Sequence, residues 1–68
     1  MLKKIRESKN ISQSEIAKLS GVSVQLIHLY EQKPERIKNA KLITLVKIAK
    51  ALECSVSDLV PDLNLKNL

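Results

Sequence analysis

The sequence predicts a small all-α fold of five helices around an aliphatic core, and three observations support this. The chain has 68 residues, a length that suits one domain with a compact core. Hydrophobic residues make up 44% of it, yet Phe and Trp are missing and Tyr occurs once, so Leu, Ile, Val and Ala must form the core. Such a composition favours helices packed on helices. Apolar residues also recur every three or four positions, which is the spacing of one helix face.

The first two helices are placed by their start and stop signals. Leu2 and Ile5 share one face of an opening helix that is expected to end near Lys9 and Asn10. The run SQSE at 12–15 is a capping box, in which the first Ser and the Glu each satisfy a backbone N–H of the other. The apolar residues of the second helix follow directly; they are Ile16, Ala17 and Leu19.

A tight corner is predicted between the second and third helices. Gly21 is the single glycine of the chain, and a left-handed glycine can end one helix and redirect the next. Ser23 is expected to cap the third helix, with Ile27 and Tyr30 on its inward face. Lys33-Pro34 then stops that helix, because a proline disfavours a helical residue before it.

The remaining elements are a connection, two helices and a tail. Residues 33–39 form a charged connection anchored by Ile37, and Asn39 is expected to cap the fourth helix. The run 55–58 resembles a second capping box and opens a short fifth helix that ends at Pro61. Residues 61–68 form a Leu-containing tail, for which fraying, packing on the domain and pairing across a dimer remain alternatives. The apolar positions of the fourth helix are Leu42, Leu45, Ile48, Ala49 and Leu52.

Charge and cysteine content restrict the class of protein. The net charge is +5 and the pI about 9.6, which suits a polyanionic partner without requiring one. Cys54 is the single cysteine, so an intrachain disulfide and a Cys-rich metal site are excluded. Neither a signal-peptide pattern nor an apolar run of about 18 residues is seen, so a cytoplasmic location and no membrane partner are expected.

Two segments of the sequence resemble the sequence pattern of a known protein family. A capped helix, a glycine turn and a second capped helix make up a helix-turn-helix unit. The run ISQSEIAKLSGVSVQLIHLYEQ at 11–32 resembles the signature of the phage repressor and Cro family, also called the XRE or lambda-repressor-like family. The run LITLVKIAKALECSVSDLV at 42–60 resembles the end of the same domain. The likeness covers residues 1–60.

The resemblance implies a five-helix DNA-binding domain over residues 1–60, with the helix-turn-helix at its second and third helices. The third helix would read the major groove, and Gln13 would donate to a phosphate and brace a reading side chain. The positions that match the groove-facing ones of the family are Ser23, Val24, Gln25, His28 and Leu29. At 100° per residue, positions 24, 25, 28, 29 and 32 independently share one face.

The groove-facing side chains suggest how bases would be read. Gln25 can form two hydrogen bonds with adenine, while Val24 and Leu29 can contact thymine methyl groups. For His28, a contact with DNA and a solvated surface position remain alternatives. The exposed aliphatic face of Val24, Leu26 and Leu29 has an alternative of its own, since such a face also suits binding to a protein.

Contacts with the DNA backbone are expected from cations and helix starts. They would come from Lys9, Lys33, Arg36, Lys38, Asn39 and Lys41, with Gln13 and Ser23 at the starts of the second and third helices. Arg6 and Glu31 match a partly buried structural ion pair of the family. The chain departs from the family pattern at Glu53, where relatives have Gly, and at Lys33-Pro34-Glu35, where the connection differs.

The sequence thus indicates a transcriptional regulator rather than an enzyme. The resemblance implies a bacterial or phage-encoded, nucleoid-associated repressor that binds double-stranded DNA as a homodimer on a palindromic operator. The contact between its two copies is expected at the fifth helix, Val60 and the tail. The alternative is a protein-interaction module, such as an antirepressor or an antitoxin-like partner. No nucleophile and base set, metal site or cofactor loop is found, and no small-molecule effector is expected.

Overall fold

The computed structural model describes residues 2–60, and every regular element among them is helical. The elements are α1 (Leu2–Ser8), α2 (Gln13–Ser20), α3 (Val24–Gln32), the 3-10 helix η1 (Pro34–Asn39), α4 (Leu42–Leu52) and α5 (Val56–Leu59). The predicted all-α fold with five α-helices is confirmed over these residues. The predicted connection after α3 is itself helical from Pro34 onward, with Pro34 in its first turn and Ile37 buried.

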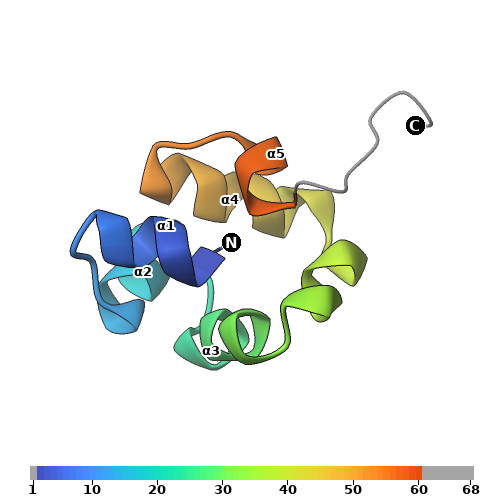
Figure 1. The fold of residues 1–68 in the computed structure, drawn as a ribbon, viewed down its shortest axis with the longest axis horizontal. Coiled ribbons are helices and arrows are strands. Elements are labelled where there is room, and N and C mark those ends of the chain that lie inside the picture. Colours follow the sequence, from blue (N-terminus) through green and yellow to red (C-terminus); the bar gives the residue numbers. More distant parts are fainter. Residues whose placement is uncertain (1, 61–68) are drawn as a thin grey trace.

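The helices enclose one aliphatic core and leave α3 at its edge. α2 packs on both α3 and α4, while α1 and η1 pack on α3 and α5 packs on α4. Figure 1 shows α4 and α5 along one side of the bundle and α3 along the opposite side. Ile16, Ile27 and Ile48 have no exposed surface, which places the core between α2, α3 and α4. Within residues 2–60, the other helices cover the inner face of α3 and leave its outer face open to solvent.

Side-chain caps fix where α2 and α3 begin. Asn10 turns the chain after α1 with a left-handed φ of 56°. The Ser12 hydroxyl accepts from the Glu15 N–H at 3.1 Å, and the Glu15 carboxylate accepts from the Ser12 N–H at 3.2 Å. Ser23 caps α3 by accepting from the Leu26 N–H at 3.2 Å. The capping box and the Ser23 cap predicted from the sequence are therefore confirmed.

The corner between α2 and α3 is built as the sequence predicts. Gly21 has a φ of 74°, and its N–H donates to the Ala17 carbonyl at 2.9 Å. The next N–H, that of Val22, donates to the Ser20 hydroxyl at 3.1 Å, and the Val22 side chain is buried in the corner. This arrangement ends α2 within one residue and turns the chain toward α3.

Two predictions at the start of α4 are wrong. Asn39 is the last residue of η1 and does not cap α4, because the extended residues Ala40 and Lys41 separate it from the first turn. The N-cap is Lys41, which makes no side-chain capping bond. Leu42 was expected on the buried face, yet it is 58% exposed. It lies in the first turn at the edge of the buried arc, whereas Leu45 and Ile48 point inward.

Two further apolar positions differ from expectation. Leu19 follows the apolar spacing of α2 but is 65% exposed, because the buried face of this helix centres on Ile16 and Ser20. Val60 was expected at a contact between two copies, but only 2% of it is exposed, so the domain itself already covers it. The predictions for the tail, including its leucines, lie outside the described residues.

Glu53 provides a test of backbone strain. It ends α4 with a left-handed φ of 56°, a conformation that disfavours residues with a Cβ. We expect Glu53→Gly to raise the free energy of unfolding by roughly 0.5–1 kcal/mol, since glycine adopts this conformation freely. Urea denaturation measures the change, and Glu53→Ala is the control, which removes the carboxylate and keeps the strain. Equal stabilities of the two variants would contradict this explanation.

Candidate nucleic-acid interface

The outer face of α3 combines polar and apolar groups. Val24, Gln25, His28 and Gln32 are exposed, whereas Leu26 and Leu29 are half-buried, and Leu26 packs against the core. Ile27 and Tyr30 are buried, as expected for the inward face. The exposed positions recur at the intervals that place them on one side of a helix. The structure therefore presents Gln25, His28 and Val24 to solvent, and turns Leu29 partly away.

An ion pair holds α1 against α3 beside this face. Arg6 Nε donates to Glu31 Oε2 at 2.6 Å, and its Nη2 donates to Glu31 Oε1 at 2.9 Å. Arg6 Nη1 also donates to the carbonyl of Ile11, in the loop before α2, at 2.7 Å. The two side chains are 12% and 3% exposed, so the pair is largely removed from water. A guanidinium that donates two hydrogen bonds to one carboxylate fixes both the distance between the two planar groups and their relative orientation.

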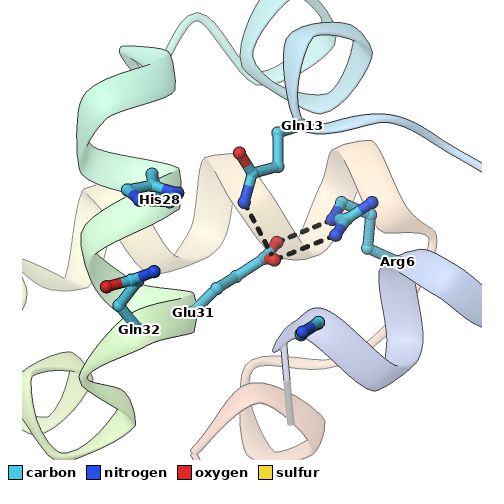
Figure 2. Close-up of a pocket in the computed structure, with 6 residues that line it drawn as sticks. Arg6, Gln13, His28, Glu31 and Gln32 are labelled. Atoms are coloured by element: carbon cyan, nitrogen blue, oxygen red, sulfur yellow. Dashed lines mark hydrogen bonds and ion pairs between the residues drawn. The ribbon is translucent and has the colours of Figure 1, made fainter.

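The same carboxylate orients the first residue of α2. Gln13 Nε2 donates to Glu31 Oε1 at 3.0 Å. Because a carboxylate only accepts, this bond fixes which end of the Gln13 amide faces Glu31. Figure 2 shows the amide nitrogen pointing to Glu31 and the carbonyl oxygen turned away from it. One N–H and the oxygen of Gln13 remain for a partner outside the protein.

The electrostatics of the pair favour the charged form of both groups. Burial alone would raise the pKa of Glu31, but hydrogen bonds from Arg6 and Gln13 and the charges of Arg6 and Lys3 hold this pKa below its usual range. The hydrogen bond to Glu31 raises the pKa of Arg6, and burial opposes the rise. Glu31 is therefore a structural carboxylate that stays ionised near neutral pH.

The Lys and Arg residues that were predicted to contact the DNA backbone lie in two separate places. Lys33, Arg36, Lys38 and Lys41 are exposed on η1 and at the start of α4, directly after α3, and Asn39 is exposed among them. Lys9 lies elsewhere: burial raises the pKa of the Cys54 thiol, and the nearby charge of Lys9 opposes that rise. Cys54 comes shortly after α4, and α4 lies along the side of the bundle opposite α3 (Figure 1). The structure thus gathers four cations beside α3 and separates Lys9 from them.

An open hollow of about 550 Å³ lies between α1, the start of α2 and α3. Part of it is drawn in Figure 2, where His28, Gln32 and Glu31 come from one helix and face Gln13 and Arg6. Lys3 was not singled out from the sequence, and position 32 was placed on the outer face of the third helix without a role of its own. Lys3 stands one turn before Arg6 on α1, and this spacing could have indicated that both reach the same site. The residues that line the hollow are Lys3, Arg6, Gln13, His28, Glu31 and Gln32.

Comparison with known proteins decides the family. The sequence profile of the helix-turn-helix family matches residues 2–59. The chain belongs to this family. The profile is that of the XRE, lambda-repressor-like group, as the resemblance implied. Neither the curated proteins nor the solved structures gave a match.

Family membership makes this chain a DNA-binding regulator of the helix-turn-helix type, with double-stranded DNA as its partner. Proteins of the family generally act by binding rather than by catalysis. Over residues 2–60, no helix is long and apolar enough to cross a membrane. Within the same range, His, Cys, Asp and Glu do not gather in a group of three or more that could hold a metal ion.

Glu31 makes the stability of the helix-turn-helix protein depend on pH. A carboxylate whose pKa is lower in the folded than in the unfolded state stabilises the fold fully above its unfolded pKa of about 4.3. That contribution is lost as the pH falls through the lowered folded pKa. We expect the Glu31→Gln variant to have a free energy of unfolding that is about 1.5–3 kcal/mol lower at neutral pH. Its stability should also fall less steeply as the pH is lowered into the acid range.

Urea denaturation of both proteins between neutral pH and acid measures this difference. Glu35→Gln, which removes an exposed carboxylate from η1, is the control and should keep the acid decline of the unmodified protein. A Glu31→Gln variant with an unchanged acid decline would show that the ion pair does not carry the pH dependence.

Proposed function

We propose that the protein is a sequence-specific transcriptional regulator that places α3 in the major groove of a palindromic operator and binds it as a homodimer. The observation that carries the proposal is the outer face of α3, where Val24, Gln25 and His28 are exposed side by side. A helix of 9 residues is about 13.5 Å long. The major groove is about 12 Å wide and admits one helix.

Gln25 is the proposed base-reading residue. It is exposed near the start of α3, and within residues 2–60 its amide makes no hydrogen bond to the protein. A free glutamine amide can donate to and accept from adenine at the same time. Val24, which is 36% exposed, would contact a thymine methyl group, and the half-buried Leu29 would add a smaller apolar contact. His28 adds a ring donor or acceptor on the same face.

The DNA strands beside α3 would be held by cations and amides. The exposed cations of η1 and the start of α4 follow α3 directly, so they suit the phosphates on one side of the groove. Ser23 and Gln13 lie at the starts of α3 and α2, where unpaired backbone N–H groups favour anions. The loss of a strand contact is expected to weaken binding to all sequences alike.

The binding of two copies follows from the size of the reading helix. An α3 of about 13.5 Å spans roughly four base pairs, too few to single out one site in a genome. A second copy one helical turn away, about 34–36 Å along the DNA, doubles the sequence that is read.

A protein-interaction role for α3 is less well supported. It rested on three exposed aliphatic residues, but Leu26 and Leu29 are half-buried, which leaves Val24 as the exposed one within α3. An isolated exposed valine does not form a protein-binding patch. Retention on DNA at low salt that falls steeply as salt rises supports the DNA-binding role, and its absence would favour the protein-binding one.

Gln25→Ala tests base reading. The variant should lose about 1–3 kcal/mol of binding free energy on the operator and accept other bases at one position, because the paired hydrogen bonds to adenine are gone. Sites selected from random duplexes, followed by titration of each single-base variant, measure both effects. Lys33→Ala is the comparison, and it should weaken every duplex by a similar factor. If the Gln25→Ala variant kept the base preference of the unmodified protein, Gln25 would not be one of the residues that read the bases.

Sedimentation of the complex tests the homodimer. A palindromic duplex should carry two chains, and a duplex with one intact half-site should bind far more weakly. A stoichiometry of one chain for each palindrome, with equal affinity for the half-site, would contradict the dimer and leave the reading role of α3 in place.

A further inference from the structure

We propose that the tail, residues 61–68, packs on an apolar surface at the start of α4 of the same chain. This surface, the α4 apolar surface, consists of Leu42, Ile43 and Val46. The tail has the sequence PDLNLKNL and follows the last described residue, Val60. The proposal goes beyond the proposed function, because it involves neither DNA nor the outer face of α3.

The start of α4 exposes adjacent aliphatic side chains. Leu42 and Ile43 are each 58% exposed. The half-buried Val46 lies four and three residues after them, so it extends the same patch by one helical turn. A single exposed apolar residue, such as Leu19 on α2, is common on soluble proteins, whereas a contiguous group indicates a contact surface. The α4 apolar surface therefore calls for an occupant.

The described part of the chain ends close to this surface. α5 packs on α4, and Val60 at the end of α5 is 2% exposed and belongs to the core. Figure 1 shows the end of α5 beside the first turns of α4. α4 has 11 residues and is about 16.5 Å long. Eight further residues can extend to about 28 Å, so the tail can reach the first turn from any point along α4.

The sequence of the tail suits an extended segment on an apolar surface. Leu63 and Leu65 are two positions apart, which places them on one face of an extended segment and Asn64 on the other. Val60, which precedes Pro61, has a φ of −130° and a ψ of 77°, so the chain has left the helical conformation where α5 ends. The two leucines can thus lie together on the α4 apolar surface.

Charge favours the same placement. Lys47 is exposed on α4 four residues after Ile43, and Lys50 is exposed one turn further on. Asp62, which precedes the first leucine of the tail, has the opposite charge. An exposed ion pair contributes little to stability, but it can favour one orientation of the tail over the reverse.

A contact within one chain is favoured over a contact between two copies. Two residues, Pro61 and Asp62, separate Val60 from Leu63. A flexible link this short keeps the tail at an effective concentration in the millimolar range beside its own α4. A second copy would have to reach the same concentration to compete for the surface.

Methyl NMR of the DNA-free protein tests the contact directly. Isotope-labelled Ile and Leu methyl groups should show nuclear Overhauser contacts between Ile43 and the leucines Leu63 and Leu65. In a mixture of labelled and unlabelled chains, these contacts should stay within the labelled chain. Contacts between a labelled and an unlabelled chain would assign the surface to a second copy and overturn the proposal. A lack of any contact between the tail leucines and α4 would overturn it as well.

A double-mutant cycle measures whether the two groups of residues act together. The tail variant Leu63→Ala/Leu65→Ala should lower the urea midpoint of the unmodified protein, because two apolar contacts are lost. The same change should leave the midpoint unaltered in a Leu42→Ala/Ile43→Ala background, where the surface is already truncated. Equal shifts in the two backgrounds, or no shift in either, would contradict the proposed contact.

Two matched variants serve as controls. Asn64→Ala changes the opposite face of the tail and should keep the midpoint of the unmodified protein. Leu19→Ala truncates an exposed leucine of α2, and in this background the tail variant should show its full shift. All these measurements are made without DNA, so their failure would leave the proposed function in place.

Discussion

The Glu31 carboxylate joins three helices, and the arrangement of the surface around α3 depends on it. It belongs to α3, accepts two hydrogen bonds from Arg6 of α1, and accepts one from Gln13 at the start of α2. With 3% of its side chain exposed, it has little access to water and relies on these donors for its solvation. Losing a donor would leave a charge buried without compensation, which costs several kcal/mol. The pair therefore specifies one relative placement of α1, α2 and α3.

The corners of the chain complete this placement. Gly21 takes a left-handed conformation directly after α2, and Asn10 takes one two residues after the end of α1. Abrupt corners of this kind keep α2 short and bring Gln13 within reach of Glu31. The core behind them is aliphatic and consists chiefly of Ile and Leu from α2, α3 and α4. Branched aliphatic side chains interlock at high density, so the helix faces that remain outside are held rigidly for binding.

In the function that we propose, some side chains read the bases and other groups hold the DNA strands. We propose that the exposed side chains of α3 discriminate between base pairs, because they project outward from the surface of the domain. The η1 cations follow one end of α3, and Gln13 and Ser23 lie at the starts of α2 and α3, so their contacts with the strands would set the depth and tilt of the helix. An Arg6–Glu31 pair that is neutral as a whole allows a strand to approach it, whereas a lone Glu31 would repel phosphate. In this proposal, the same residues have both a structural and a binding role.

Local sequence determined much of this protein by itself. The capping box at Ser12, the cap at Ser23 and the corner at Gly21 are satisfied by neighbours a few residues away, so their patterns predict them correctly. The inward positions of α3 follow from helical spacing alone. Other features were decided by tertiary structure. Leu19 and Leu42 fit an apolar spacing but stay exposed, because within residues 2–60 no helix covers their side of α2 or α4. The hollow that includes Lys3 arises from residues on three helices, and the burial of Val60 depends on how α5 closes on the core. Spacing along one helix shows which residues share a face, whereas packing between helices decides which faces are covered.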